Sequence, residues 1–544
     1  MYEANQRPNG CQRNSKNSQQ MKLRNSAIFL HNPAYFWLWI TLLVWWSGLA
    51  GRDFYLIPAL IFIGICSYHI LKKKELIIST KWITSTSGQR WIIFIFFLHV
   101  VLYLVITILK YYSFRWNVWD VGNFSNKLYN ISQGRFYSSY LGSHNWADHF
   151  TPSMSPLAIL YLWIPSTHWV TLAKTIAFLS VPPLIFQICR ESFQEKEQAW
   201  IVTLILGAAW MLFYAPALNS YYYEFQPSAL APPFILYAFL CFQRKEWFVF
   251  WIVMIVLLGF KEHLGAVWIG FGCYMVLTTP FKKTGFFLIV AGIIAIYLIM
   301  FQVMPFFRNY EASWSMVIGP FQDILAKLIY LFKILIPFAF LPVIHWRFGI
   351  MAGPAIGVNL ISANSAMYST SYHYDDMSAT LLILTMILIL SSKNNMFEPW
   401  KKRKDRQWLI VVWGVCILSL LPSSPMRELY AAIPKQSHWD YRNELLKFDQ
   451  FSQGESIAVQ TALGAHFNRT GIMAITDDIN GNCAPMRHDL KVKEPKYLVF
   501  ANKLNHYLIN DLEQCLKRMN LSNDFEKLTE YKHLQIYKLI YSKK

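Results

Sequence analysis

Five short tracts that combine acidic, histidine, lysine or aromatic residues border the apolar stretches of this chain. They are Trp119-Asp120, Asp148-His149, Tyr223-Glu224, Lys261-Glu262-His263 and His373-Tyr374-Asp375-Asp376. Carboxylates and imidazoles are costly next to hydrocarbon, so several at one depth of a membrane indicate a polar site. There, carboxylates could exchange protons with a substrate and cations could hold a phosphate.

Asp120 is the first candidate for catalysis. It lies shortly beyond a predicted spanning helix at 91–110, at the start of a predicted surface helix. Its carboxylate could act as a general base or orient a substrate hydroxyl. It could also cap the surface helix, because Asp accepts hydrogen bonds from the free N–H groups of a first turn. The two roles do not exclude each other.

The tract WADHFTP places a carboxylate beside an imidazole, at Asp148 and His149. Such a pair can act as a base and its orienting partner, bind a divalent metal or hold substrate hydroxyls. Hydrogen bonding within the loop is the alternative. Glu224 follows three tyrosines that are typical of an aromatic belt, but a belt does not explain its carboxylate. Glu224 is therefore a candidate for substrate binding, and a divalent metal at Asp120, His149 and Glu224 is possible.

Lys261, Glu262 and His263 interrupt an apolar run with almost no loop around them. A plain turn would need only small residues, so this tract favours buried ion pairing or phosphate binding. Lys261 or His263 could neutralise a phosphate leaving group. All three are candidates for substrate binding.

His373 and Tyr374 form the last candidate pair for substrate binding. Asp375 and Asp376 precede a predicted helix, where capping and the helix dipole account for them. The chain contains no P-loop, GxSxG, HExxH or CxxC motif, so the tracts carry information together and not singly.

The elements that must position these tracts are predicted to be membrane-spanning helices. Of 544 residues, 55% are hydrophobic and only 15% are charged, too few to cover a soluble protein of this length. Apolar runs of about 18 residues recur, which is long enough to cross a bilayer. We predict about thirteen helices: 33–50, 54–71, 91–110, 167–189, 199–214, 228–242, 247–260, 264–279, 284–303, 324–342, 348–365, 377–391 and 408–422.

The basic residues predict the orientation of these helices. Basic clusters near 72–74, 244–245, 282–283 and 401–404 lie at the helix ends opposite the five tracts. The positive-inside rule places the clusters in the cytoplasm and the tracts on the outer face. Topology and anionic lipid then explain much of the net charge of +19, so no nucleic-acid partner is expected. Residues 1–30 are predicted to be a disordered cytoplasmic tail without a cleavable signal peptide.

Two polar regions accompany the predicted membrane domain at 31–422. Residues 111–166 form a long outer loop with a surface helix and a re-entrant or interfacial segment. Residues 423–544 are predicted to be an outer α/β domain, with three or four strands in ESIAVQ, GIMAI, YLVFA and LQIYKLI and a helix at 504–520. Cys483 and Cys515 lie in this domain, where an oxidising compartment would permit a disulfide.

The tracts, in their order, resemble a family of multipass membrane proteins called domain of unknown function 2079. The matching segments are WDVGNFSNKLYNISQGRFY, GSHNWADHFTPSMSPLAILY, YYYEFQPSALAPPFILYAF, LLGFKEHLGAVWIG and SYHYDDMSATLL. That family is similar to the type-C glycosyltransferases, which use a lipid-linked sugar donor at the outer membrane face. Those enzymes keep an essential acidic residue in the first long outer loop, and Asp120 matches it by position. Family members more usually have Phe-Asp where this chain has Trp-Asp.

The resemblance and the residues together predict an all-α polytopic bundle with a small extracytoplasmic α/β domain, in the bacterial inner membrane. The leading hypothesis is a glycosyltransferase that moves a sugar from a polyprenyl-phosphate donor to an extracytoplasmic acceptor. Asp120 would be catalytic, and the other candidate residues would bind substrate. A transporter or lipid flippase is an alternative, although transporters place ionisable residues at the midplane and use internal repeats. A non-enzymatic envelope scaffold is the third possibility.

Overall fold

The computed structural model describes most of the chain. The described residues are 33–48, single positions between 54 and 65, 85–308, 318–319, 321–392, 424–477, 483–486, 494–522 and 524–540. The chain forms two compact units, residues 1–79 with 396–427 and residues 80–395 with 428–544. In the first unit, helix α2 spans Pro33–Ser47. The predicted tail 1–30, the predicted helix 408–422 and most of the predicted helix 54–71 lie outside the described residues.

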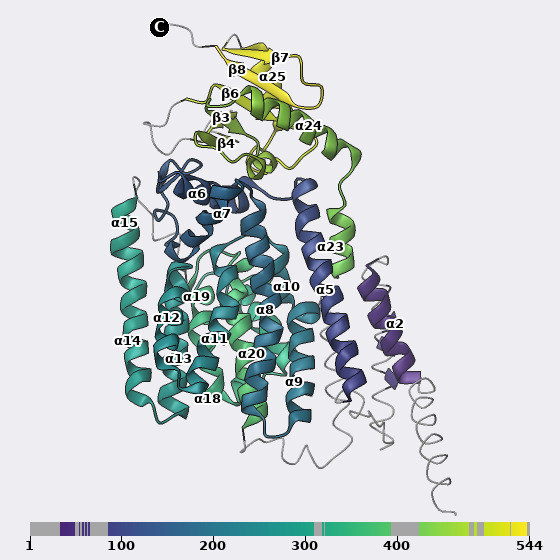
Figure 1. Cartoon of the computed structure of the whole chain (residues 1–544), viewed down its shortest axis with the longest axis vertical. Coiled ribbons are helices and arrows are strands. Elements are labelled where there is room, and N and C mark those ends of the chain that lie inside the picture. Colours follow the sequence, from purple (N-terminus) through teal and green to yellow (C-terminus); the bar gives the residue numbers. More distant parts are fainter. Residues whose placement is uncertain are drawn as a thin grey trace, which may run out of the picture. The chain divides into compact units, whose positions relative to one another are not determined.

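The second unit is mostly helical (Figure 1). Its principal helices are α5 (Thr86–Tyr112), α8 (His168–Ser192), α9 (Lys196–Ala208), α10 (Ala215–Tyr222), α11 (Ala231–Arg244), α12 (Trp247–Leu258), α13 (Gly265–Thr278), α14 (Lys282–Leu298), α15 (Met304–Phe307), α16 (Ile324–Leu335), α17 (Leu341–Ile344), α18 (Trp346–Gly349), α19 (Gly353–Ile361) and α20 (Asp376–Ser391). Within the described residues, four helices are long and apolar enough to cross a membrane, and the bent pair at 196–222 would be a fifth. The predicted count of thirteen is not confirmed.

The predicted continuous helices 324–342 and 348–365 are wrong, because the chain breaks there into short pieces. α16 ends at Leu335, and Ala339 and Phe340 adopt left-handed backbone angles with φ of 51° and 57°. Pro337 and Pro342 each lack an N–H donor, so neither can complete the hydrogen-bond ladder of a longer helix. The apolar composition did not reveal these interruptions, and large apolar side chains of α16 such as Leu325 and Phe332 are exposed.

The helices differ in how much of their surface the protein covers. In the span that ends with α20, 83% of the residues are buried, compared with 17% in α5. A helix that is apolar on all sides belongs either in a core or against lipid. α20 is the central helix of the bundle, whereas α5 and α14 expose large apolar side chains such as Phe97 and Phe286. Such outward-facing apolar surfaces are typical of a protein surrounded by lipid.

Residues 117–163 form a compact cap on one end of the bundle. They include a π-helical turn η1 (Val118–Gly122), α6 (Asn123–Ser132), a hairpin of β1 (Tyr137–Ser138) and β2 (Ser143–His144), η2 (Pro152–Leu157) and α7 (Ala158–Trp163). α6 corresponds to the predicted surface helix but is almost entirely buried. Its polar residues have partners, since Asn126 donates to the Arg469 carbonyl at 2.9 Å and Lys127 pairs with Asp148.

The C-terminal region contains a six-stranded sheet with the order β5-β4-β3-β6-β8-β7. The strands are β3 (Ile457–Val459), β4 (Ile472–Asp477), β5 (Cys483–Pro485), β6 (Tyr497–Phe500), β7 (Phe525–Leu528) and β8 (Gln535–Leu539). Strands β4, β3 and β6 are parallel, and the outer pairs are antiparallel. The prediction of three or four strands missed β5 and β7, because both are short edge strands without an apolar run.

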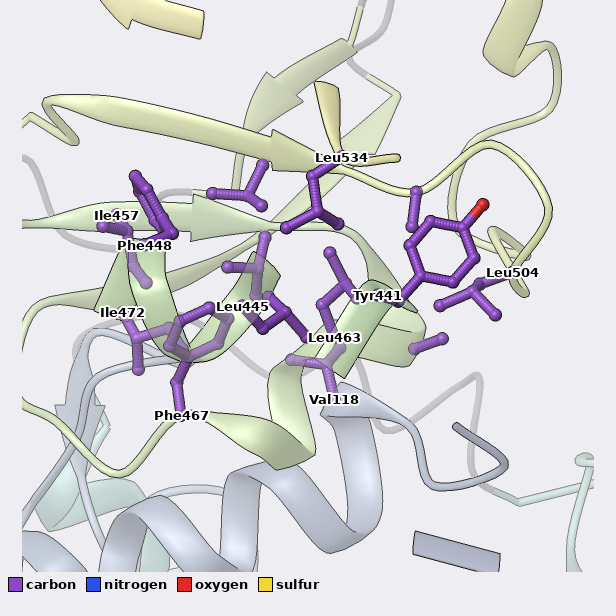
Figure 2. Close-up of a cluster of buried hydrophobic side chains, with 14 of the residues drawn as sticks. Val118, Tyr441, Leu445, Phe448, Ile457, Leu463, Phe467, Ile472, Leu504 and Leu534 are labelled. Atoms are coloured by element: carbon purple, nitrogen blue, oxygen red, sulfur yellow. The ribbon is translucent and has the colours of Figure 1, made fainter. Parts of the chain in front are cut away.

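Two helices cover the two faces of this sheet, in agreement with the alternation of side chains along a strand. α24 (Gln436–Phe451), which the sequence did not predict, packs with Ile457 and Val459. α25 (Leu512–Leu521) packs with Ala458 on the other face and is shorter than the predicted helix at 504–520. The cluster on the α24 face also includes Val118 from η1 (Figure 2). The sheet and the cap therefore share one hydrophobic core.

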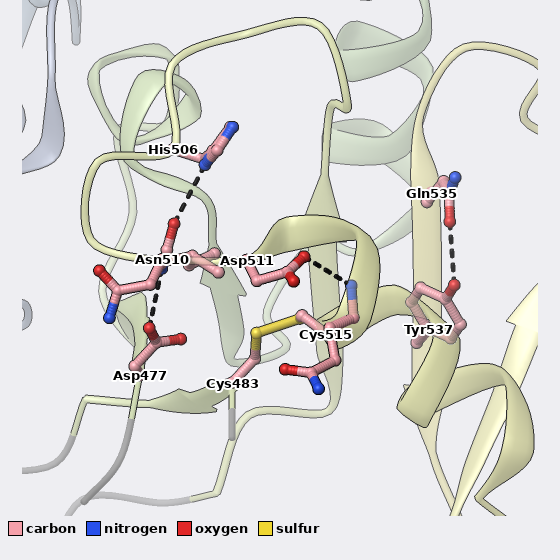
Figure 3. The surroundings of a disulfide bond; sticks show 10 residues. Asp477, Cys483, His506, Asn510, Asp511, Cys515, Gln535 and Tyr537 are labelled. Carbon is pink, nitrogen blue, oxygen red and sulfur yellow. Dashed lines mark hydrogen bonds between the residues drawn. A yellow bond between two sulfur atoms is a disulfide. The ribbon is translucent and has the colours of Figure 1, made fainter. Parts of the chain in front are cut away.

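The predicted disulfide between Cys483 and Cys515 is present and joins β5 to α25 (Figure 3). The segment before α25 is also fixed at two points. The backbone N–H of Asn510 donates to Asp477 at 2.8 Å, and the Asp511 carboxylate caps α25 by accepting from the Gln514 N–H at 2.9 Å. These contacts anchor the chain between β6 and α25, a segment that approaches the candidate site.

Candidate active site

The five tracts meet at the end of the helical bundle that carries the cap and the sheet. α11 and α13 begin at this end and run to the opposite end, where Lys245 and Lys282 follow them (Figure 1). α20 also begins at the tract end, with Asp376. The structure therefore separates the acidic and histidine tracts from these basic turns. The side of a membrane that each end faces stays a prediction.

Asp120 lies in η1 at the centre of this assembly and is partly accessible. Its carboxylate accepts hydrogen bonds from the Gln226 amide and the Tyr223 hydroxyl. Lys261 Nζ donates to the other end of the Gln226 side chain at 3.0 Å, so Gln226 links the lysine to the carboxylate. No side chain caps η1 or α6, and the N-cap of α6 is Gly122. The expectation that Asp120 could be a helix cap is therefore wrong.

Burial raises the pKa of Asp120, while Tyr223, Lys261 and Gln226 oppose this effect in that order. A carboxyl in such surroundings can take up and release a proton closer to neutral pH than an ordinary aspartate can. That property suits a general base that must be ionised before the reaction and protonated after it.

Glu224 holds the turn that carries Asp120. Its carboxylate accepts from the backbone N–H of Asn117 at 2.9 Å, from the Asn117 amide and from the backbone N–H of Val121. Burial and the neighbouring charge of Asp120 raise the pKa of Glu224, and the hydrogen bonds from Asn117 and Val121 oppose this effect. With its acceptor sites used by the turn, Glu224 acts as a positioning residue in this structure. Its predicted contact with substrate stays untested.

Two lysines from spanning helices hold the chain around Glu224. Lys174 Nζ donates to the carbonyls of Tyr223 and Glu224 at 2.7 and 2.9 Å, and Lys110 Nζ donates to the Tyr222 carbonyl at 2.8 Å. These carbonyls follow the end of α10, where a helix leaves acceptors without partners and favours cations. The lysines therefore fix the backbone that aims Tyr223 and Glu224.

His149 and Glu262 connect the cap to the turn between α12 and α13. His149 Nδ1 lies 2.9 Å from Glu262 Oε1, and the backbone N–H of Phe150 donates to Glu262 Oε2 at 3.3 Å. Burial opposes ionisation of Glu262, but His149 and the charge of Lys261 hold its pKa below the usual range. The predicted buried ion pairing in this tract is thus present, although the partner of Glu262 comes from a distant loop.

Asp148 lies in the same loop but has local partners. Lys127 Nζ donates to it at 2.5 Å, and the backbone N–H of His149 donates at 2.8 Å. Burial opposes ionisation, yet the charges of Lys127 and His149 hold the pKa of Asp148 below its usual range. These contacts match the loop-bonding alternative, so Asp148 stabilises the cap, and a role in substrate binding stays a prediction.

The cationic side of the site is formed by Lys261 and the aromatic residues of the last tract. Lys261 is 2% exposed, and its Nζ lies 5.7 Å from the ring centroid of Tyr374. The imidazole of His373 packs between the rings of Tyr374 and Tyr223, with centroids 4.0 and 5.0 Å away. It is 4% exposed, and within the described residues neither ring nitrogen has a hydrogen-bond partner. A buried imidazole without a partner indicates a place for a polar ligand.

His263 fits a cationic role less well. Burial lowers its pKa to about 3, and the charge of Lys261 adds to the effect. At neutral pH its imidazole is uncharged, so Lys261 is the better candidate for neutralising an anion. The predicted substrate contact of His263 is not tested by this arrangement.

Asp375 and Asp376 are not explained by capping, contrary to the prediction. Neither η9 (His373–Asp375) nor α20 has a side-chain cap. Instead, Asp376 accepts from the Ser220 hydroxyl and from the Ser228 hydroxyl at 3.0 Å. Hydroxyl groups from other elements bond to both carboxylates, contacts that local sequence rules do not describe, although Asp375 Oδ2 has no partner among the described residues.

The predicted metal set does not converge. Among the described residues, no group of three or more His, Cys, Asp and Glu side chains could hold a metal ion. His149 is paired with Glu262, and Glu224 with Asn117, so these side chains turn away from a common centre. A divalent metal at Asp120, His149 and Glu224 is therefore not supported by this geometry.

Gln226 is the main site residue that the sequence reasoning missed. It lies two positions after Glu224 in the segment YYYEFQP and bridges Lys261 to Asp120. A neutral amide carries no charge signal, and its polar position between Phe225 and Pro227 was the only indication. Lys110 and Lys174 were missed because they lie within apolar helices.

One known protein family matches the larger part of the chain. The family model described as a predicted membrane protein, DUF2079, matches residues 110–463. The chain belongs to the DUF2079 family. The predicted resemblance is confirmed, and the match includes every candidate residue of the site. No curated protein matches the chain.

A solved structure supports the fold. The crystal structure of ArnT from Cupriavidus metallidurans bound to undecaprenyl phosphate is similar, with a TM-score of 0.53 and 11% identity. The match covers 84% of this chain and 99% of ArnT. The chain therefore has an ArnT-like membrane fold. At this identity the likeness concerns the fold alone.

Proposed function

We propose that this DUF2079 protein is a membrane glycosyltransferase that moves a sugar from a polyprenyl-phosphate donor to an extracytoplasmic acceptor. The observation that carries the proposal is the partly accessible Asp120 carboxylate, which Gln226 links to the buried cation of Lys261. A base and an anion-binding cation side by side are what such a transfer requires. The ArnT-like fold, in a protein crystallised with undecaprenyl phosphate, supports the choice of donor.

The reaction is a substitution at the anomeric carbon of the donor sugar. An acceptor hydroxyl oxygen forms a bond to that carbon, and the bond from the carbon to the phosphate oxygen breaks. The acceptor proton passes to Asp120, and polyprenyl phosphate leaves with the electron pair. Asp120 must be ionised at the start, so the hydrogen bonds that favour its charged form support the reaction.

The leaving phosphate gains negative charge as the bond breaks. Lys261 would stabilise this charge, and the unpartnered imidazole of His373 would donate one hydrogen bond to a phosphate oxygen. Lys261 is almost fully buried, and removal from water strengthens its attraction for an anion. Tyr374, beside both residues, would shape the same pocket.

The proposed orientation follows from the reaction. The tract end, the cap and the sheet would face the extracytoplasmic side of a bacterial inner membrane, and the N-terminus would be cytoplasmic. The lipid part of the donor would lie in the bilayer, and its phosphate would reach the end of the bundle where Lys261 lies. Labelling of single cysteines at positions 245 and 503 in intact cells would test this orientation.

The proposed activity can be tested with the full chain in lipid nanodiscs. Undecaprenyl-phosphate-linked radiolabelled glucose, mannose and galactose are offered in turn, and formation of free undecaprenyl phosphate is measured with and without sugar acceptors. We expect discharge of at least one donor. Failure to discharge any of them, together with label accumulation in sealed vesicles, would instead support the transporter alternative. If the protein shows neither donor discharge nor label accumulation, the result would support the envelope scaffold.

A further inference from the structure

The loop between β6 and α25, residues 501–511, is held in a defined conformation next to the candidate site. The Gln460 amide donates to the carbonyls of Ala501, Leu504 and Asn505 at 3.1, 3.1 and 3.0 Å. Its oxygen accepts from the Ala501 N–H at 2.8 Å. Gln460 is fully buried at the end of β3. One buried side chain thus fixes the start of the loop with four hydrogen bonds.

The sheet domain is also packed directly onto the turn that carries Asp120. A Cβ atom on Gly464 would lie 2.6 Å from Val118 Cγ2, and one on Gly122 would lie 3.3 Å from the Gly464 carbonyl carbon. The Tyr140 hydroxyl donates to the Gly464 carbonyl at 2.8 Å, and the Thr167 hydroxyl donates to the next carbonyl, of Ala465, at 2.7 Å. This close approach sets the position of loop 501–511 relative to Asp120.

Two side chains of the loop approach the site. The Asn505 amide donates to Asn117 Oδ1 at 3.3 Å, and Asn117 is the residue that binds Glu224. The charges of Glu224 and Asp120 both act on the Tyr507 hydroxyl. Tyr507 is 51% exposed, so much of its ring is open to solvent near these two carboxylates. Its backbone N–H is fixed by the Asn505 side chain at 3.1 Å.

We propose that Tyr507 and Asn505 form the acceptor wall of the site and that the acceptor group they bind is a sugar ring. An open aromatic face packs against the C–H face of a pyranose, and a neighbouring amide bonds its hydroxyls. The wall belongs to the sheet domain, on the side of Asp120 away from the bundle, whereas the donor lipid must come from the bilayer. This inference rests on the proposed function and names its acceptor class.

The test is saturation-transfer NMR on the full chain in nanodiscs, with the methyl pyranosides of glucose, galactose and mannose as probes. This measurement reports binding without turnover. We expect ring-proton signals from at least one glycoside, a loss of about tenfold in affinity for Tyr507→Ala, and near wild-type binding for Tyr507→Phe, which keeps the ring. Absence of binding to the wild type, or equal binding by Tyr507→Ala, would overturn the inference.

Phe451→Ala is the matched control. Phe451 is an aromatic residue of the same domain with 56% exposure, and it packs on Tyr497 at the start of β6, at the strand end opposite the loop. We expect this variant to bind the probes as the wild type does. A second measurement separates the acceptor wall from the proposed function. It is the release of undecaprenyl phosphate from the donor without a sugar acceptor, when water takes the sugar. If Tyr507→Ala binds normally while donor discharge persists, only the acceptor wall is refuted; if the wild type discharges no donor, the proposed function fails.

Discussion

Two acidic turns at the same end of the bundle each place an aspartate after an aromatic residue, but their surroundings differ. Asp120 lies in η1 just before α6, and Asp375 and Asp376 lie just before α20. Asp120 is partly accessible and is bonded to Tyr223 and to Gln226, and Gln226 links it to Lys261. Asp375 is fully buried, and its Oδ1 accepts from Tyr330, Ser378 and Asn359 at 2.6, 3.0 and 3.3 Å.

The difference between the turns lies in what their partners can do. Hydroxyls and an amide that come from packed helices lock Asp375 and Asp376, so these carboxylates join α10, α16, α19 and α20. The partners of Asp120 instead link it through Gln226 to a buried cation and leave one side of its carboxylate accessible. A buried carboxylate that is held by several packed helices supports the fold, whereas one that keeps an accessible edge can meet a substrate.

The largest expected effect comes from Asp120→Asn. Loss of general-base catalysis lowers the rate of sugar transfer by about 10²- to 10⁴-fold. The amide keeps the size of the side chain and can still bond Tyr223, so the thermal midpoint of unfolding should change little. The measurement is kcat for release of undecaprenyl phosphate, beside a melting curve of the same sample. Full transfer activity in this variant would remove Asp120 from catalysis.

A smaller loss is expected for Glu224→Gln, which acts through the turn. The new amide cannot accept all the hydrogen bonds from Asn117 and Val121, so Asp120 shifts from its place. Small displacements of a catalytic group can cost about 10²-fold in rate. We expect about a 10- to 100-fold decrease in kcat with the donor KM nearly unchanged. A change in donor KM alone would mean that Glu224 contacts substrate.

Much of the site could be predicted because charged residues within apolar sequence are conspicuous. The tracts and the helical bundle followed from such local signals, whereas the sequence only permitted the disulfide between Cys483 and Cys515. The contacts that distinguish the two turns did not, since they join distant positions. Gln226 and Asp120 are 106 positions apart, and Ser220 and Asp376 are 156 apart. Capping rules address only the nearest residues, and for both turns they gave the wrong partner.

A substitution in the turn before α20 should lower the stability of the protein and leave catalysis unchanged. In Asp376→Asn, the amide nitrogen faces hydroxyl donors, so one hydrogen bond to Ser220 or Ser228 is weakened in a buried place. We expect a loss of about 1–3 kcal/mol in the free energy of unfolding. Transfer activity per folded molecule should stay within about twofold of the wild type, an energy of less than 1 kcal/mol. Melting curves and active-fraction kinetics measure both quantities, and a large loss of kcat in folded protein would erase the distinction between the turns.

The smallest effect, a shift in pH dependence, tests the link between Lys261 and Asp120. Burial raises the pKa of Asp120, and Tyr223, Lys261, Gln226 and His149 lower it in that order. An ionised Asp120 is the active base, so activity should rise with pH through its pKa. Lys261→Gln removes a positive charge that favours the ionised form, and the acid limb of kcat/KM should therefore move to higher pH. Lys245→Gln, at the opposite end of the bundle, is the control and should leave the limb in place. If the acid limb of kcat/KM stays fixed or moves to lower pH in Lys261→Gln, the lysine does not tune the pKa of Asp120. If the rate instead falls as pH rises through this range, Asp120 acts as an acid.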